Sequence, residues 1–169
     1  MALLGAAAPG APAKEVSAEK WVRSVCTALG KWEDALAAAR ANQDPDATEP
    51  EDRKEAVVDY LDEVTDATST LLADLKKAGT PDVDNGKAVA KAFRKGFGQA
   101  RATFVDASDA AERLETDDPA QFDDDVADIV SAIETGAGEI GETFDEADSK
   151  YDVPELDQAF EAEPACAGG

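Results

Sequence analysis

The chain lacks histidine entirely, and it has only two cysteines and one methionine, Met1, among its 169 residues. Histidine supplies most general bases, activates serine and cysteine nucleophiles, and is the commonest transition-metal ligand. Without it, and with so few sulfur atoms, a zinc, haem or iron–sulfur ligand set cannot be assembled. We therefore expect a protein that is not an enzyme, with no catalytic residue, no metal site and no cofactor. A hydrolase built on two carboxylates is the remaining catalytic alternative.

Basic and aromatic residues are also scarce. The 16 Lys and Arg stand against 38 Asp and Glu, for a formal net charge of -22, and aromatic residues make up 6% of the chain. Such an excess of negative charge repels nucleic acid, which is therefore not an expected partner. Adaptation of a whole proteome to salt is an alternative origin of the acidity. It explains poorly why residues 117–169 hold 17 acidic residues and only one basic residue.

Long apolar runs are missing as well, and none approaches the roughly 20 residues that a membrane-spanning helix needs. The segment 1–16 is rich in small apolar residues, has no basic start, and contains Ala11-Pro12-Ala13, which has the shape of a signal-peptidase site. We interpret this segment as a disordered stub, either the remnant of an export signal or a flexible spacer. One domain is expected at 17–169.

The chain does contain apolar residues at helical spacing. This periodicity predicts four long helices at about 17–42, 51–78, 87–115 and 120–151, and a short helix at about 155–161. Connections of about 4 to 9 residues make sequential helices antiparallel. We expect an all-α fold, an antiparallel up-down four-helix bundle with a short C-terminal helix and tail, and no β-strand.

Local signals add detail at three places. Ser17 is a typical N-cap for the first helix, and Asp84 or Asn85 is a typical N-cap for the third. The fourth helix contains three glycines within residues 134–141, and each costs about 1 kcal/mol relative to alanine in a helix interior. We expect a neighbouring helix to come very close at these glycines, and a kink is the alternative.

The two cysteines lie near opposite ends of the chain, Cys26 in the first predicted helix and Cys166 in the tail. An even number of cysteines in this arrangement is expected if a disulfide closes the fold. In the alternative, Cys26 is a small core residue and Cys166 is an idle thiol. We favour the disulfide, because an exposed free thiol in a tail is a liability. A disulfide in turn favours an extracytoplasmic location.

Two acidic segments suggest cation sites but fit them poorly. If Gly86 were the sixth residue of an EF-hand loop, Pro81 and Val83 would occupy the first and third positions, where oxygen ligands are needed. The aspartates within residues 117–128 suit the start of a helix, where negative charge is favourable. We expect a solvated helix start there, with weak calcium or magnesium binding as the alternative.

One basic stripe contrasts with the acidic chain. Residues 87–101 carry five basic residues and no acidic one, and at 100° per residue these are expected to cluster on an exposed face, away from Phe93 and Phe97. The stripe is either a solvated face balanced by acidic residues of another helix or a surface that binds an anionic partner. The candidate partner-binding residues are Lys87, Lys91, Arg94, Lys95 and Arg101.

Four segments carry a resemblance to known proteins: WVRSVCTALGKWEDAL, YLDEVTDATSTLLADLKKAGTPDVDNG, RLETDDPAQF and ELDQAFEAEPAC. Together they resemble a group of small secreted or envelope-attached helical proteins of high-GC Gram-positive bacteria (actinobacteria), over about residues 17–166. The resemblance depends on the paired cysteines and on the TPDV and TDDP loops. It implies an exported protein at or near the cell surface, and no established activity.

Two functions follow as expectations. The first is a non-catalytic extracytoplasmic helical module that binds a partner protein or an anionic envelope component. The alternative is a carrier of a small ligand or a divalent cation, with a pocket between helices. Titration with calcium and magnesium, and thermal-shift screening of apolar ligands, should give no response for the first function and a response for the second.

Overall fold

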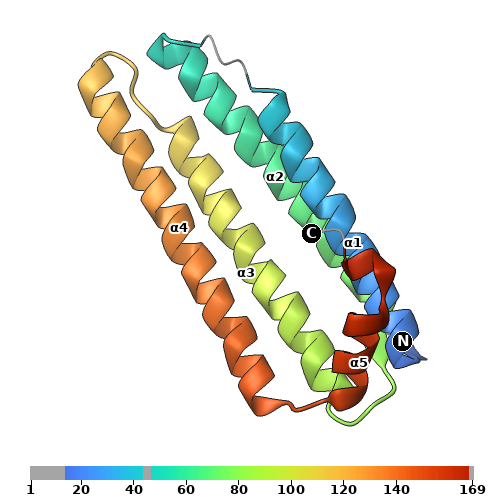
Figure 1. The fold of residues 1–169 in the computed structure, drawn as a ribbon. Helices are drawn as coiled ribbons and strands as arrows, with labels where there is room; N and C mark the ends of the chain where they lie inside the picture. Colours follow the sequence, from blue (N-terminus) through green and yellow to red (C-terminus); the bar gives the residue numbers. More distant parts are fainter. Residues whose placement is uncertain (1–13, 44–46, 168–169) are drawn as a thin grey trace, which may run out of the picture.

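Helices make up most of the described chain, and the prediction of an all-helical protein is confirmed. The computed structural model describes residues 14–43 and 47–167. Successive long helices lie side by side, and α5 crosses one end of the molecule near the start of α1 (Figure 1). The elements are β1 (Glu15–Val16), α1 (Ala18–Ala41), α2 (Pro50–Ala78), β2 (Thr80–Pro81), α3 (Gly86–Glu112), α4 (Pro119–Lys150), α5 (Pro154–Ala162) and the 3-10 helix η1 (Pro164–Cys166).

The helix ends follow local sequence signals. Ser17 is the N-cap of α1, as predicted, and its hydroxyl oxygen accepts a hydrogen bond from the Lys20 amide at 3.4 Å. Asp118 caps α4 in the same way, through the Ala120 amide at 3.0 Å. Gly79 ends α2 with a φ of 83°, a backbone conformation that glycine adopts without steric cost. These caps fix the helix bounds within a few residues of the predicted ones.

The start of α3 corrects one expectation. Asn85 occupies the N-cap position, but its side chain makes no capping hydrogen bond. A capping side chain reaches the first amides of a helix from an extended backbone, whereas Asn85 has a left-handed backbone with a φ of 60°. Its carbonyl oxygen instead accepts hydrogen bonds from the amides of Ala88 at 2.8 Å and Val89 at 3.0 Å.

A short β-pair also differs from the prediction of no strand. β1 pairs in parallel with β2, with Glu15 opposite Thr80 and Val16 opposite Pro81. The Thr80 amide donates to the Lys14 carbonyl at 3.0 Å. Strands of two residues are too short to produce an alternating apolar pattern, so no sequence signal predicts them. The predicted disordered stub, residues 1–16, therefore has an ordered end at 14–16, and its remainder lies outside the described residues.

The buried side chains form two separate clusters. The first lies at the α5 end of the molecule and is centred on Trp21, with residues of α1, α2, α3 and α5 around it. The second is centred on Phe122, which is 0% exposed, and joins α4 to α2 and α3 at the other end. Alanine contributes many of the core positions in both clusters. The close packing through small side chains agrees with the low aromatic content of the chain.

The α3–α4 contact is close because glycines lie in it. A Cβ added at Gly136 would lie 2.6 Å from the hydroxyl oxygen of Thr103, and one added at Gly96 would lie 2.7 Å from the ring of Phe144. The predicted close approach is therefore observed at Gly136. It does not extend to Gly138 or Gly141, where an added Cβ would meet nothing within 4 Å.

The four long helices form a series of packed pairs. α1 packs on α2, α2 on α3, and α3 on α4, and within the described chain no contact of comparable extent joins α4 to α1. α5 and η1 pack on α1 instead. α5 therefore lies on α1 at the end of the molecule where α4 ends (Figure 1), and this arrangement shapes the sites described next.

Candidate functional site

A groove between α3 and α4 gathers four lysine side chains. Lys87, Lys91 and Lys95 of α3 line it together with Lys150 of α4, and its volume is about 560 Å³. Residues four apart lie on the same side of a helix, so the three α3 lysines face the groove as a row. Glu146 is the acidic residue of its lining. We call this feature the lysine groove.

The structure divides the predicted basic stripe into two parts. The three α3 lysines are exposed and line the lysine groove, whereas Arg94 is half-buried and does not line it. Arg101 is turned towards α2, where its Nε donates a hydrogen bond to the Ser69 hydroxyl oxygen at 2.7 Å. Arg94 contradicts the expectation of five exposed cations, because it is half-buried. At 100° per residue the five positions cover a wide arc of the helix, so they do not all share the same surroundings.

Lys150 was missed by the sequence analysis. It is the last residue of α4, and sequence periodicity alone does not show which residue of one helix will lie opposite a given residue of another. One signal did exist, because Lys150 is the only basic residue in 117–169. A single lysine in so acidic a segment is a candidate for a contact that requires positive charge.

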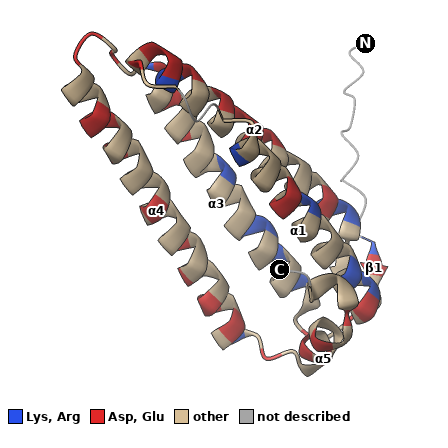
Figure 2. Ribbon diagram, turned by 45° about the horizontal axis from the view of Figure 1, so that its top comes forward, with Lys and Arg blue, Asp and Glu red and all other residues tan. Residues whose placement is uncertain are grey.

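The lysine groove is not neutralised by ion pairs of the described chain. Those ion pairs join Arg23 to Glu163, Arg53 to Asp123, and Lys77 to Asp74, and none includes a groove lysine. Figure 2 shows blue segments at intervals along α3 beside the red segments of α4. The interpretation of the stripe as a face balanced by acidic residues of another helix therefore has the acidic residues of α4 in its favour, but no direct ion pair to a groove lysine.

An apolar cavity lies on the other side of the α3–α4 contact. Its volume is about 440 Å³, and α1, α3, α4 and α5 all contribute to its walls. Ala92, Ala147 and Tyr151 line both this cavity and the lysine groove. We call it the aromatic cavity, after the rings of Phe93, Phe97, Phe144, Tyr151 and Phe160.

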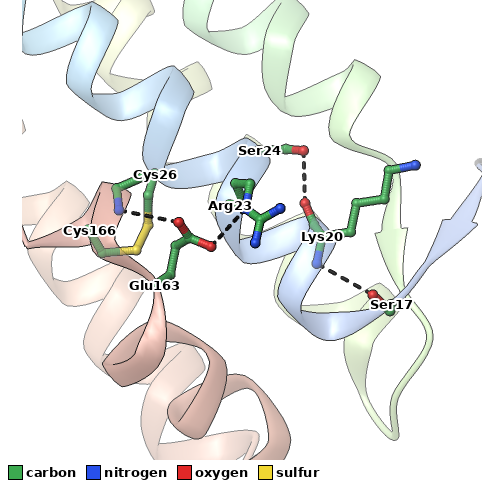
Figure 3. Close-up of polar contacts among 8 residues, drawn as sticks. Ser17, Lys20, Arg23, Ser24, Cys26, Glu163 and Cys166 are labelled. Carbon is green, nitrogen blue, oxygen red and sulfur yellow. Dashed lines mark hydrogen bonds and ion pairs between the residues drawn. A yellow bond between two sulfur atoms is a disulfide. The ribbon is translucent and has the colours of Figure 1, made fainter.

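The wall formed by α5 is held on α1 by covalent and polar contacts (Figure 3). Cys26 and Cys166 lie at disulfide distance, with their Cα atoms 5.1 Å apart, as the sequence predicted. Beside them, the Arg23 Nε donates to the Glu163 carboxylate at 3.0 Å. The same carboxylate accepts from the Ala165 amide at 3.3 Å and so caps η1. These contacts fix the C-terminal segment that closes the aromatic cavity.

Both tryptophans pack behind the rings of the cavity. Trp21 meets Phe93 edge to face, with ring centroids 5.4 Å apart, and Trp32 meets Phe97 in the same way at 5.5 Å. The Trp32 Nε1 donates to the Thr68 hydroxyl oxygen at 3.1 Å. The Trp21 Nε1 is buried without a hydrogen-bond partner. The indole rings therefore support the cavity wall from α1.

The two acidic segments bring no cation site together. Among residues 14–43 and 47–167, no group of three or more Asp, Glu, His or Cys side chains could hold a metal ion. Asp125 and Asp128 instead line a wide groove of about 770 Å³ between α3 and the first half of α4, which they share with Arg113. The structure therefore brings ammonium groups together in one groove and rings in one cavity, and both can bind ligands by charge and packing.

Comparisons with known proteins give no relative from which a function could be transferred. No family model matches the chain, and no significant match is found among curated proteins or among solved structures. Within the described residues, no helix is both long enough and apolar enough to cross a membrane.

Proposed function

We propose that the protein is a non-catalytic extracytoplasmic binding module that holds an anionic partner, an acidic protein surface or an anionic envelope component, in the lysine groove. One observation carries this proposal. Four lysines from two helices surround one groove in a chain whose net charge is -22. Two of their spacings are like-charge i,i+4 pairs, each of which destabilises a helix by about 0.2 to 0.5 kcal/mol. An anion in the groove would remove this repulsion.

The geometry of the helix ends supports the proposal. Lys87 lies in the first turn of α3 and Lys150 in the last turn of α4, and both line one groove. Together with the short connections, this supports an antiparallel up-down order of the four long helices. The extracytoplasmic location is supported by Cys26 and Cys166 at disulfide distance, because disulfides persist in oxidising compartments.

The test is calorimetric titration with two defined polyanions, polyglutamate for an acidic protein surface and polyglycerol phosphate for an anionic wall polymer. The groove variant reverses Lys87, Lys91 and Lys95 to Glu. The matched control reverses three exposed lysines outside the groove, Lys20, Lys31 and Lys76, and both variants change the net charge equally.

The native protein should bind at least one polymer, with an affinity that falls as salt is added. The groove variant should lose this binding, and the control should keep most of it. Loss of binding in both variants would show a dependence on total charge alone, and absence of binding by the native protein would also contradict the proposal. Thermal melting of each variant establishes that it is folded.

A second candidate function, a carrier of a small ligand, is supported by the aromatic cavity. Its volume of about 440 Å³ lies within the range of about 300 to 1,000 Å³ that is usual for ligand pockets. Thermal-shift screening of apolar compounds tests this function. In an Ala147→Trp variant, the larger side chain would occupy part of the aromatic cavity, which Ala147 lines. This variant should abolish any rise in melting temperature that a compound causes in the native protein.

A further inference from the structure

We infer that the aromatic cavity binds an organic cation, an ammonium group carried on an apolar body. This inference rests on the second candidate function, the ligand carrier, and is independent of the lysine groove. It names the chemical class of the ligand, which the volume of the cavity alone leaves open.

The rings of the cavity are the first argument. Its walls contain five of the ten Phe, Trp and Tyr residues of the chain. The Phe93 ring lies between other rings, edge to face with Phe144 at 5.4 Å and stacked on Phe160 at 6.4 Å. The faces of aromatic rings attract cations, and sites lined by several rings recognise quaternary ammonium groups. The lining therefore suits a cation as well as an apolar group.

The charges of the lining are the second argument. Asp148 of α4 and Asp157 of α5 contribute to the cavity wall, and no lysine or arginine does. Both aspartates are exposed, which places their carboxylates where the cavity meets solvent. An anionic ligand would be repelled at this opening, and a neutral ligand would gain nothing from it. A cationic ligand gains from both carboxylates.

The surrounding segment extends this preference. Residues 144–161 contain seven acidic residues and one basic residue, Lys150. The Lys150 ammonium group lies 5.5 Å from the centre of the Tyr151 ring, and Lys150 lines the lysine groove rather than the aromatic cavity. One ring of the cavity wall is thus already in contact with an ammonium group on the groove side. Apart from Lys150, every charged residue of this segment is acidic.

The probe is benzyltrimethylammonium, compared with its neutral isostere 2,2-dimethylpropylbenzene and with the anion 3-phenylpropionate. Trp21 and Trp32 pack against rings of the cavity wall, so tryptophan fluorescence should report on occupancy, and calorimetry gives the affinity. The cation should bind more tightly than the isostere, by about threefold to thirtyfold. The anion should not bind measurably.

Two carboxylate variants locate the effect. Asp148→Asn with Asp157→Asn should weaken binding of the cation about threefold to tenfold and leave that of the neutral isostere unchanged. The matched control, Asp145→Asn with Glu161→Gln, changes the net charge equally at exposed positions outside the cavity lining. The control should retain most of the affinity. A third variant, Tyr151→Leu, removes one ring and should weaken the cation more than the isostere.

The outcomes separate the two levels of the proposal. If the isostere binds as tightly as the cation, the ligand carrier stands and the preference for a cation is wrong. If neither compound binds, both are wrong, while binding of polyanions in the lysine groove is unaffected. Equal losses in the cavity variant and the control would also overturn the inference, because the effect would then come from total charge.

Discussion

Breaking the link between Cys26 and Cys166 should lower the free energy of unfolding by about 3 to 5 kcal/mol. The two cysteines are 140 residues apart in sequence, and on the chain-entropy argument closing a loop of that length is worth about 5 kcal/mol. The lower bound allows for disulfides that deliver less than this estimate. A loss of this size is a large part of the stability of a typical domain, about 5 to 15 kcal/mol.

The assay is urea unfolding, followed by circular dichroism and tryptophan fluorescence, on native protein with and without reductant and on Cys166→Ala. Cys166→Ala is the preferred variant because Cys26, which is 5% exposed, then stays in the core as a small apolar side chain. Reduced protein and variant should unfold at the same lower urea concentration. In thermal melts, the midpoint should fall by about 6 to 20 °C.

Two results would refute this reasoning. Oxidised and reduced protein could unfold at the same urea concentration, which would mean that the two thiols are not linked or that the link stabilises nothing. Alternatively, reduction could release α5 alone, seen as an early fluorescence change before an unaltered main transition. The link would then act locally on one wall of the aromatic cavity rather than on the whole unfolded chain.

Two further predictions concern local structure. Gly136→Ala should destabilise the fold by about 1 to 3 kcal/mol, since the added Cβ would meet Thr103. Gly138→Ala should stabilise it by about 0.5 to 1 kcal/mol, because the space at Gly138 is open. Urea unfolding of both variants measures the difference. Hydrogen bonds from the backbone at Glu19 and from the Ser17 side chain lower the pKa of the Glu19 carboxyl in the folded protein. The ionised carboxylate therefore contributes to stability above the unfolded pKa of 4.5. This contribution is lost as the pH falls through the lower pKa of the folded protein. Glu19→Gln should therefore reduce stability at neutral pH and have no effect in strong acid, and an equal loss at both pH values would contradict this assignment.

The helices and their ends could be read from the sequence because the signals that set them are local. The apolar period, the Ser17 cap and the Gly79 stop all act within one or two turns of the chain. The same holds for the row formed by Lys87, Lys91 and Lys95, since residues four apart share a helix side whatever surrounds it. The expected side-chain cap by Asn85 failed because a left-handed backbone carries that turn.

The pairing of Cys26 with Cys166 could be predicted for a different reason. With two cysteines in the chain, only one intramolecular partner exists, so the prediction needed no knowledge of how the helices pack. The contacts around the link were not predictable in this way. The Glu163 carboxylate accepts a hydrogen bond from Arg23, which lies 140 residues earlier in the chain. The sequence offers many other acidic residues that could have paired with Arg23, so this contact could not be predicted.

The sequence by itself determined an acidic, helical chain with one row of lysines and one possible disulfide, because composition and the helical period are properties of neighbouring residues. Only the tertiary structure decided that Lys150 lines the same groove as that row, that Arg94 and Arg101 lie outside the groove, and that rings of α3, α4 and α5 line one cavity. These outcomes depend on which helices pack together and on the rotation of each about its axis. Both are set by contacts between residues far apart in the chain, such as those at Gly96 and Gly136.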